Sequence, residues 1–144
     1  MNHSIRFTPP RVNPGIKPAI VLLTALLALL FCLRNPLFHA MAPGFDASLF
    51  AVMGKMWSEG GVLYRDMIDI KGPMIFALDA LGYGMGGFVG IWVLEWVLCW
   101  LGLLASWQAF AQLGLSFKAR LGAMLAVLAL YGTRYYYGNM TEDW

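Results

Sequence analysis

An apolar run of 23 residues, Phe88 to Phe110, constrains this chain more than any other feature, because Glu95 is its only charged side chain. A helix of that length matches the roughly 30 Å hydrocarbon core of a bilayer. Hydrophobic residues make up 60% of the chain and charged residues only 12%, against about 25% charged residues in ordinary soluble domains. We therefore expect an all-α integral membrane protein.

Two further apolar stretches lie before and after this run, and a large polar loop separates the first of them from it. Residues 19–33 carry no charge, and residues 121–131 lead into three consecutive tyrosines, which suit a membrane interface. We expect about three transmembrane helices in a domain at 19–144, near residues 19–34, 88–110 and 120–137. A cleaved signal peptide is the competing interpretation of the first stretch, although its Ala40-Met41-Ala42 pattern lies well past the apolar run.

The distribution of basic residues predicts the orientation. The tail at 1–18 and the link carrying Lys118 and Arg120 contain basic residues and no acid, which favours the cytoplasm. The loop from Arg34 to Gly87 balances four basic residues against five acids, so we expect residues 35–87 outside. The prediction is a multi-pass protein of the inner (cell) membrane with a cytoplasmic N-terminus.

The external loop contains two short apolar segments. Residues 47–57 show the periodicity of an amphipathic helix on the membrane surface, with Asp46 as its N-cap and Gly60-Gly61 at its end. Its apolar face is expected to comprise Leu49, Phe50, Met53, Met56 and Trp57. Residues 74–81 predict a re-entrant or interfacial helix, too short to span. Four glycines should then break the chain, at positions 82, 84, 86 and 87.

Several residues of the long apolar run invite a structural or a functional interpretation. Trp92, Trp96 and Trp100 recur every four residues and should share one helix face, turned to lipid or to another helix. Glu95 is an acid at membrane depth, which is expected to bond a neighbouring helix, to pair with Arg134 or to line a cavity. The cysteines, Cys32 and Cys99, sit in apolar runs and are interpreted as small buried hydrophobes.

Chemistry is expected in the external loop. Lys71-Gly72-Pro73 places a cation beside a rigid turn, where an ammonium can hold a phosphate. A nearby carboxylate, Asp46, Asp66 or Asp69, could accept a proton from a hydroxyl or amine nucleophile. Each acid also has a structural interpretation, as a helix cap or as a solvated turn residue.

The loop motifs resemble those of a known family. In order and spacing, the segments resemble the N-terminal part of bacterial GT-C glycosyltransferases, in the branch of the protein O-mannosyltransferase and aminoarabinose-transferase-like enzymes. They are Asp46-Ala47-Ser48-Leu49-Phe50, Gly54-Lys55, Glu59 to Asp66, Asp69 to Pro73, and Gly138 to Glu142. The chain has Lys71-Gly72-Pro73 where better-known members have Lys-Pro-Pro.

The resemblance implies inverting transfer of a sugar from a polyprenyl-phosphate-linked donor at the external membrane face. It implies that Asp46 is the catalytic base or a metal-associated carboxylate, with a divalent metal ion left open as cofactor. Lys71 and Arg65 would bind the donor phosphate, and three further acids would shape the site: Asp66, Asp69 and Glu142. The expected partners are the lipid bilayer and the lipid-linked donor, with an acceptor that the sequence does not identify and no nucleic acid.

Family members have many more spans than this chain, so we expect a truncated fragment of a larger GT-C fold, whose own activity the sequence leaves open. The alternative is a small, non-enzymatic membrane protein or accessory subunit whose loop binds a partner.

Overall fold

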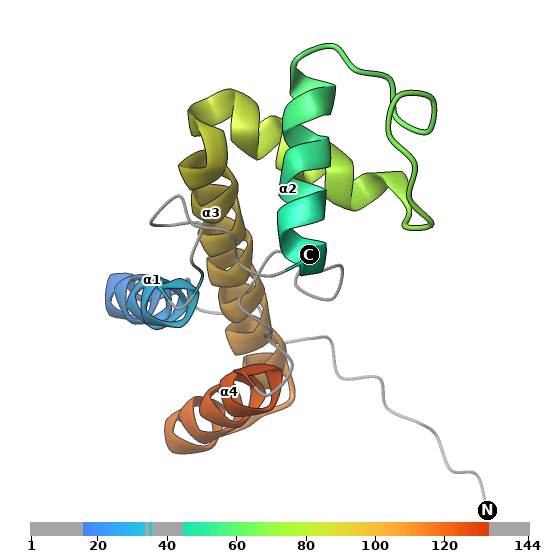
Figure 1. Cartoon of the computed structure of the whole chain (residues 1–144). Coiled ribbons are helices and arrows are strands. Elements are labelled where there is room, and N and C mark those ends of the chain that lie inside the picture. The colour runs from blue at the N-terminus through green and yellow to red at the C-terminus, as the bar shows by residue number, and fades with distance from the viewer. Residues whose placement is uncertain (1–15, 34, 36–44, 133–144) are drawn as a thin grey trace, which may run out of the picture.

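The computed structural model describes residues 16–33, 35 and 45–132, and its regular secondary structure in these ranges is helical (Figure 1). This confirms the expected helical class. On length and composition, α3 is the one helix in the described part of the chain that could cross a membrane, whereas α1 is apolar but shorter. The helices are α1 (Pro18–Cys32), α2 (Phe45–Ser58), α3 (Pro73–Gln112) and α4 (Phe117–Gly132).

α3 is bent into two arms. Its backbone leaves the helical region at Gly86 and Gly87, and Gly87 has φ 64° and ψ −148°, a conformation that side chains strongly disfavour. Figure 1 shows the first arm, 73–85, running across the end of the second arm, 88–112. The expected break before the long apolar run is therefore confirmed at Gly86-Gly87. It is wrong for Gly82 and Gly84, which lie inside the first arm.

The two arms touch through glycines. A Cβ added at Gly82 would lie 2.6 Å from Ile91 Cα, and one added at Gly90 would collide with the carbonyl oxygen of Gly82. Backbones can approach this closely only where neither residue has a side chain. The second arm contains 25 residues, or about 37 Å of helix at 1.5 Å per residue, enough to cross a bilayer.

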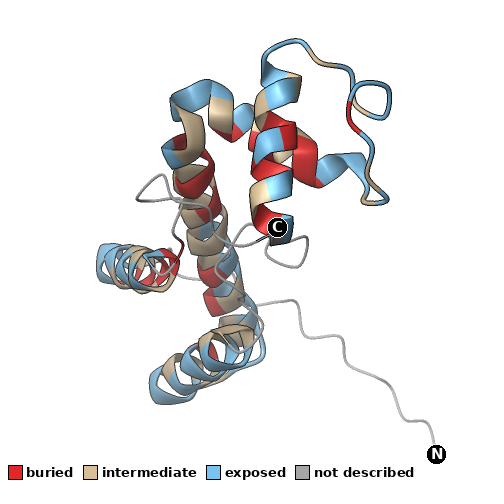
Figure 2. Cartoon of the chain, viewed as in Figure 1, coloured by how far each residue is buried: buried red, intermediate tan, exposed pale blue. Residues whose placement is uncertain are grey.

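α2 packs on the first arm of α3 through a face that differs from the predicted one. Phe50 and Met53 are buried as expected, with Phe50 edge-on to Phe76 at 5.9 Å between ring centroids. Leu49 and Met56 are exposed, and smaller residues complete the buried face instead. The buried residues of α2 are Ala47, Phe50, Ala51, Met53 and Gly54 (Figure 2).

The start of α2 also differs from the prediction. Asp46 lies within the first helical turn and therefore does not precede the helix as an N-cap. Its charge still favours the positive end of the helix dipole. The end is as predicted, because Gly60 has φ 98° and the amides of Gly60 and Gly61 donate to Trp57 and Met56. These two bonds form a Schellman motif, which needs a residue with positive φ.

α1 packs on a ladder of tryptophans. Trp92, Trp96 and Trp100 stack with centroid separations of 6.5 and 6.4 Å and interplanar angles of 15° and 14°. The Nε1–H of Trp92 donates to the carbonyl of Cys32 at 2.7 Å, and that of Trp96 donates to Ala25 at 3.2 Å. The predicted shared face is confirmed, and it faces another helix.

The spacing of the contact residues explains how α1 crosses α3. The buried residues of α1 also recur every four positions, at Ile20, Thr24, Ala28 and Cys32. Interlocking four-residue rows favour a crossing angle of about 50°. In Figure 1 α1 is seen nearly end-on and the second arm of α3 from the side, so the two cross steeply.

α4 follows a turn at Gly114 and packs at the far end of α3. Met124 is fully buried with Ile20 of α1 and Trp107 of α3. The Arg120 guanidinium lies 5.7 Å from the centroid of the Trp107 ring and donates to the carbonyl of Leu115. The predicted third span is therefore helical over 117–132, and its remaining residues, 133–137, lie outside the described residues.

The contact between the arms of α3 predicts opposite effects for two glycines on the same helix. Gly82→Ala should destabilise the fold by about 1–3 kcal/mol, because the new methyl group meets the backbone of the second arm. Gly84→Ala is the matched control, since nothing lies within 4 Å of its added Cβ and alanine favours a helix by about 1 kcal/mol. Thermal unfolding in detergent, followed by circular dichroism, measures both. Equal stability of the two variants would refute the close contact.

Candidate functional site

The segment between α2 and α3 is a compact loop, residues 59–72, held by its own backbone. The amide of Tyr64 donates to the carbonyl of Met67 at 2.9 Å, and Asp66 N donates to Val62 O at 2.9 Å. Tyr64 has φ 64°, which is uncommon for a residue with a side chain and marks a tight turn. Met67 is buried with Phe50 and Phe76, so it anchors the loop to the core.

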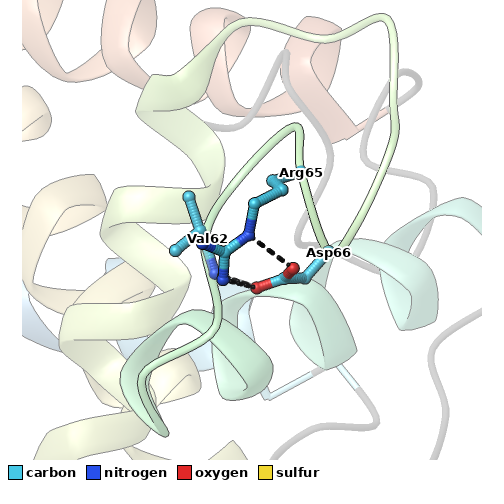
Figure 3. A network of polar contacts seen from close by, with 3 residues as sticks. All are labelled: Val62, Arg65 and Asp66. Atoms are coloured by element: carbon cyan, nitrogen blue, oxygen red, sulfur yellow. Dashed lines mark hydrogen bonds and ion pairs between the residues drawn. The ribbon is translucent and has the colours of Figure 1, made fainter.

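Arg65 and Asp66 form an ion pair on this loop (Figure 3). Nε and one terminal nitrogen of Arg65 each donate to a carboxylate oxygen of Asp66 at 2.8 Å. Asp66 also accepts the amide of Val62 at 2.8 Å. These bonds lower the pKa of Asp66, with the Arg65 bonds contributing most, and raise that of Arg65.

The direction of the Asp66 pKa shift determines the pH range in which the ion pair with Arg65 stabilises the fold. A lowered folded-state pKa stabilises the fold above the unfolded value of about 3.9, and the effect is lost as the pH falls through the lowered value. The carboxylate is therefore ionised at neutral pH. Both groups are exposed to solvent, so the pair organises the loop and contributes little to global stability.

Asp69 and Lys71 form the end of the loop. Asp69 Oδ1 accepts the amide of Lys71 at 2.8 Å, and the Tyr64 hydroxyl donates to the Lys71 carbonyl at 2.7 Å. The Lys71 side chain is half-buried and makes no ion pair with any described residue. Gly72 follows as the N-cap of α3, with Pro73 in the first turn and no side-chain hydrogen bond to the cap.

The structure brings together some of the predicted site residues and not others. Arg65 contacts Asp66, and Asp69 bonds the backbone of Lys71. Asp46 is exposed on α2 and makes no hydrogen bond or ion pair with the loop among the described residues. Glu142 lies outside the described residues.

The metal ion left open for Asp46 has no ready-made site among the described residues. They contain no group of three His, Cys, Asp or Glu side chains placed to hold an ion. A stable divalent-cation site needs several oxygen ligands from the protein, its substrate or water.

Two polar residues, Asp79 and Asn35, are fully buried in the fold, which the sequence did not predict. Asp79, counted there only among the loop acids, is fully buried where α2 crosses the first arm of α3. A Cβ at Gly54 would collide with that of Asp79, so α2 passes directly over it. An acid within the apolar segment 74–81 was the available signal.

Asn35 is the second such position. It is buried just beyond α1, and its side-chain amide donates to Glu95 Oε2 at 2.5 Å, while its backbone amide donates to the carbonyl of Cys32. Glu95 therefore bonds the segment just after α1, whereas the expected partner was a neighbouring helix. Arg134, its other expected partner, lies outside the described residues.

Comparisons of this chain with protein-family models, with curated proteins and with solved structures found no match. Its chemistry has to be inferred from its own residues.

The buried bond between Asn35 and Glu95 predicts non-additive losses of stability. Asn35→Ala and Glu95→Ala should each destabilise the fold, and the double variant should lose about 1–3 kcal/mol less than their sum, because either single change leaves a buried polar partner behind. Thr24→Ala combined with Glu95→Ala is the control, since the Thr24 hydroxyl bonds only carbonyls of its own helix. Thermal unfolding of these variants, and of Thr24→Ala alone, measures both couplings. Additive losses in the Asn35 pair would show that the two side chains are not coupled.

Proposed function

We propose that this chain belongs to a membrane glycosyltransferase of the GT-C type, which transfers a sugar from a polyprenyl-phosphate donor to an acceptor at the external membrane face. The order of the loop motifs supports this assignment, as does the helical architecture with its long apolar arm. The observation that carries it is the position of Lys71 beside the uncapped start of α3.

That position suits a phosphate for two physical reasons. A helix N-terminus carries partial positive charge and unsatisfied amides, and no side chain caps the start of α3. The Lys71 ammonium adds a full charge and has no competing ion pair among the described residues. A phosphate diester would neutralise both the partial charge of the helix N-terminus and the Lys71 ammonium. Arg65 lies in the same loop.

In this proposal each charged residue of the site has its own role in the transfer reaction. Asp46 is exposed, and it takes the proton from the acceptor hydroxyl or amine as that atom attacks the anomeric carbon. The bond from that carbon to the donor phosphate breaks, and Lys71 stabilises the charge that develops on the leaving polyprenyl phosphate. Asp66 and Asp69 hold the loop in shape, and Glu142 supplies a further acid.

The proposal includes an arrangement in the membrane. The second arm of α3 crosses the bilayer. The apolar stretches of α1 and α4 are assigned the other spans from the sequence alone, because the steep crossing of α1 over this arm is not the packing of two adjacent spans. Residues 35–87 lie outside and the α3–α4 turn lies inside, because basic residues without acids concentrate at the tail and at that turn.

Lys71 provides the first test. Binding of polyprenyl phosphate to the purified full chain in detergent should weaken about tenfold or more in Lys71→Ala, as expected for loss of a charge-assisted bond. Lys55→Ala should bind normally, because Lys55 lies on α2 and pairs with Glu59. Polyprenol, which lacks the phosphate, is the ligand control. Equal binding of phosphate and alcohol would refute the proposed phosphate site.

Asp46 provides the test of catalysis. Asp46→Asn should bind polyprenyl phosphate normally and lose transfer, measured as release of polyprenyl phosphate from a polyprenyl-phosphate hexose or pentose, because the amide cannot accept the proton. Full transfer by Asp46→Asn would leave that residue a helix-dipole role only. Transfer is measured in a complete enzyme that contains this segment, because a truncated chain would lack the rest of the donor cavity.

Orientation is tested with single cysteines. Ser58→Cys and Ser116→Cys, in a background with Cys32→Ala and Cys99→Ala, place thiols at exposed positions at the end of α2 and in the α3–α4 turn. In intact cells an impermeant thiol reagent should label position 58 and spare position 116. Labelling of position 116 alone would reverse the proposed topology.

A further inference from the structure

The loop between α2 and α3 ends in a cluster of apolar side chains that face solvent. Ile68 is 85% exposed, Ile70 is 99% exposed, and Met74 at the start of α3 is 70% exposed. Three large apolar side chains this exposed within seven positions are a feature that indicates an interaction surface. We name these three residues the apolar tip.

The apolar tip continues along one face of the first arm of α3. Met74, Leu81 and Met85 are separated by seven and four residues, so they share a helical face, and all three are exposed. The opposite face of this arm carries Ile75 and Phe76, which are buried in the same cluster as residues of α2. The exposed strip ends at the Gly86-Gly87 corner, where the long apolar arm begins.

Part of the loop backbone beside the apolar tip is already bonded internally. Backbone amides of Tyr64, Arg65, Asp66 and Lys71 bond within the loop, as does the Lys71 carbonyl. Internal bonding of this kind lowers the cost of leaving water. The charge of Arg65 is balanced by Asp66. Lys71 lies between Ile70 and Met74, with an aliphatic stem that allows its ammonium to reach back to headgroups.

We infer that the apolar tip inserts into the boundary between the headgroups and acyl chains of a phospholipid bilayer and anchors the loop there. The inference rests on the membrane assignment within the proposed function and is independent of phosphate binding. Lipid is the occupant because the exposed strip is continuous with the arm that is long enough to cross the membrane. In this position Lys71 reaches headgroup phosphates.

A fluorophore at the tip tests the inference. Ile70→Cys, in the background with Cys32→Ala and Cys99→Ala, is labelled with an environment-sensitive nitrobenzoxadiazole and reconstituted as the full chain into phosphatidylcholine vesicles. The emission should shift to the blue and be quenched by lipids that carry a nitroxide near the top of the acyl chain. The same label at Ser58→Cys, an exposed position at the end of α2, is the reference for an aqueous probe.

Substitutions elsewhere in the tip show whether it drives insertion. Ile68→Ser with Met74→Ser should move the Ile70 probe into water, with a red shift and loss of nitroxide quenching. Leu113→Ser removes an exposed apolar side chain at the α3–α4 turn and should leave the probe unchanged. A probe at position 70 with the emission and quenching of the one at position 58 would overturn the inference, and a protein partner would then be the occupant to seek.

This experiment distinguishes failure of the membrane-insertion inference from failure of the proposed phosphate site. These vesicles contain no polyprenyl phosphate, so insertion is measured without the donor, and nitroxide lipids in both leaflets report either orientation of the chain. An inserted tip without polyprenyl phosphate binding would retain this inference and remove the phosphate site. Phosphate binding in detergent with an aqueous tip would do the reverse.

Discussion

The close approach of the two arms of α3 at Gly82 and Gly90 is the constraint on which the described fold depends. It holds the first arm across the end of the second, with the Gly86-Gly87 corner supplying the turn. α2 can then pack on both arms at once, because Phe50 meets Phe76 of the first arm while Ala51 lies in the cluster of Ile91 and Trp92 of the second. This packing places the loop that follows α2 beside the start of α3.

Local signals predicted the helices well and their packing poorly. Long apolar stretches and the Gly60-Gly61 stop located the helices, because composition and turn chemistry act within a few residues. Gly82 was misinterpreted as a breaker, since its role is contact with a residue eight positions away across a bend. The exposed Leu49 and Met56 were assigned to the buried face, because periodicity shows that a face exists and not which helix covers it. Asp46 shifted from cap to first turn, within the usual error of one or two residues at a helix end.

In the candidate site, too, local features could be predicted from the sequence and contacts between residues could not. A charged loop beside apolar segments was evident from the residues, and so was a cation next to a Gly-Pro turn. Which acid bonds which group was not, because Asp66 also accepts the amide of Val62, and that contact exists only once the turn at Tyr64 has formed. Asn35 was missed for a different reason. Its partner, Glu95, is 60 residues away, and no pattern in one sequence links an isolated amide after α1 with an acid in the middle of α3.

The proposed phosphate site and the proposed membrane insertion of the loop support each other, because both require Lys71 to lie at the depth of the lipid headgroups. A polyprenyl-phosphate donor keeps its phosphate among the headgroups while its chain lies in the hydrocarbon, so a protein cation must reach that level to bind it. Lys71 has Ile70 before it and Met74 three positions after it, and both are strongly exposed. Sinking these two side chains to the top of the acyl chains would fix the Lys71 backbone, already bonded by Tyr64 and Asp69, at the boundary. The ammonium and the open start of α3 would then face the phosphate at its own depth, and the donor could be held without leaving the membrane.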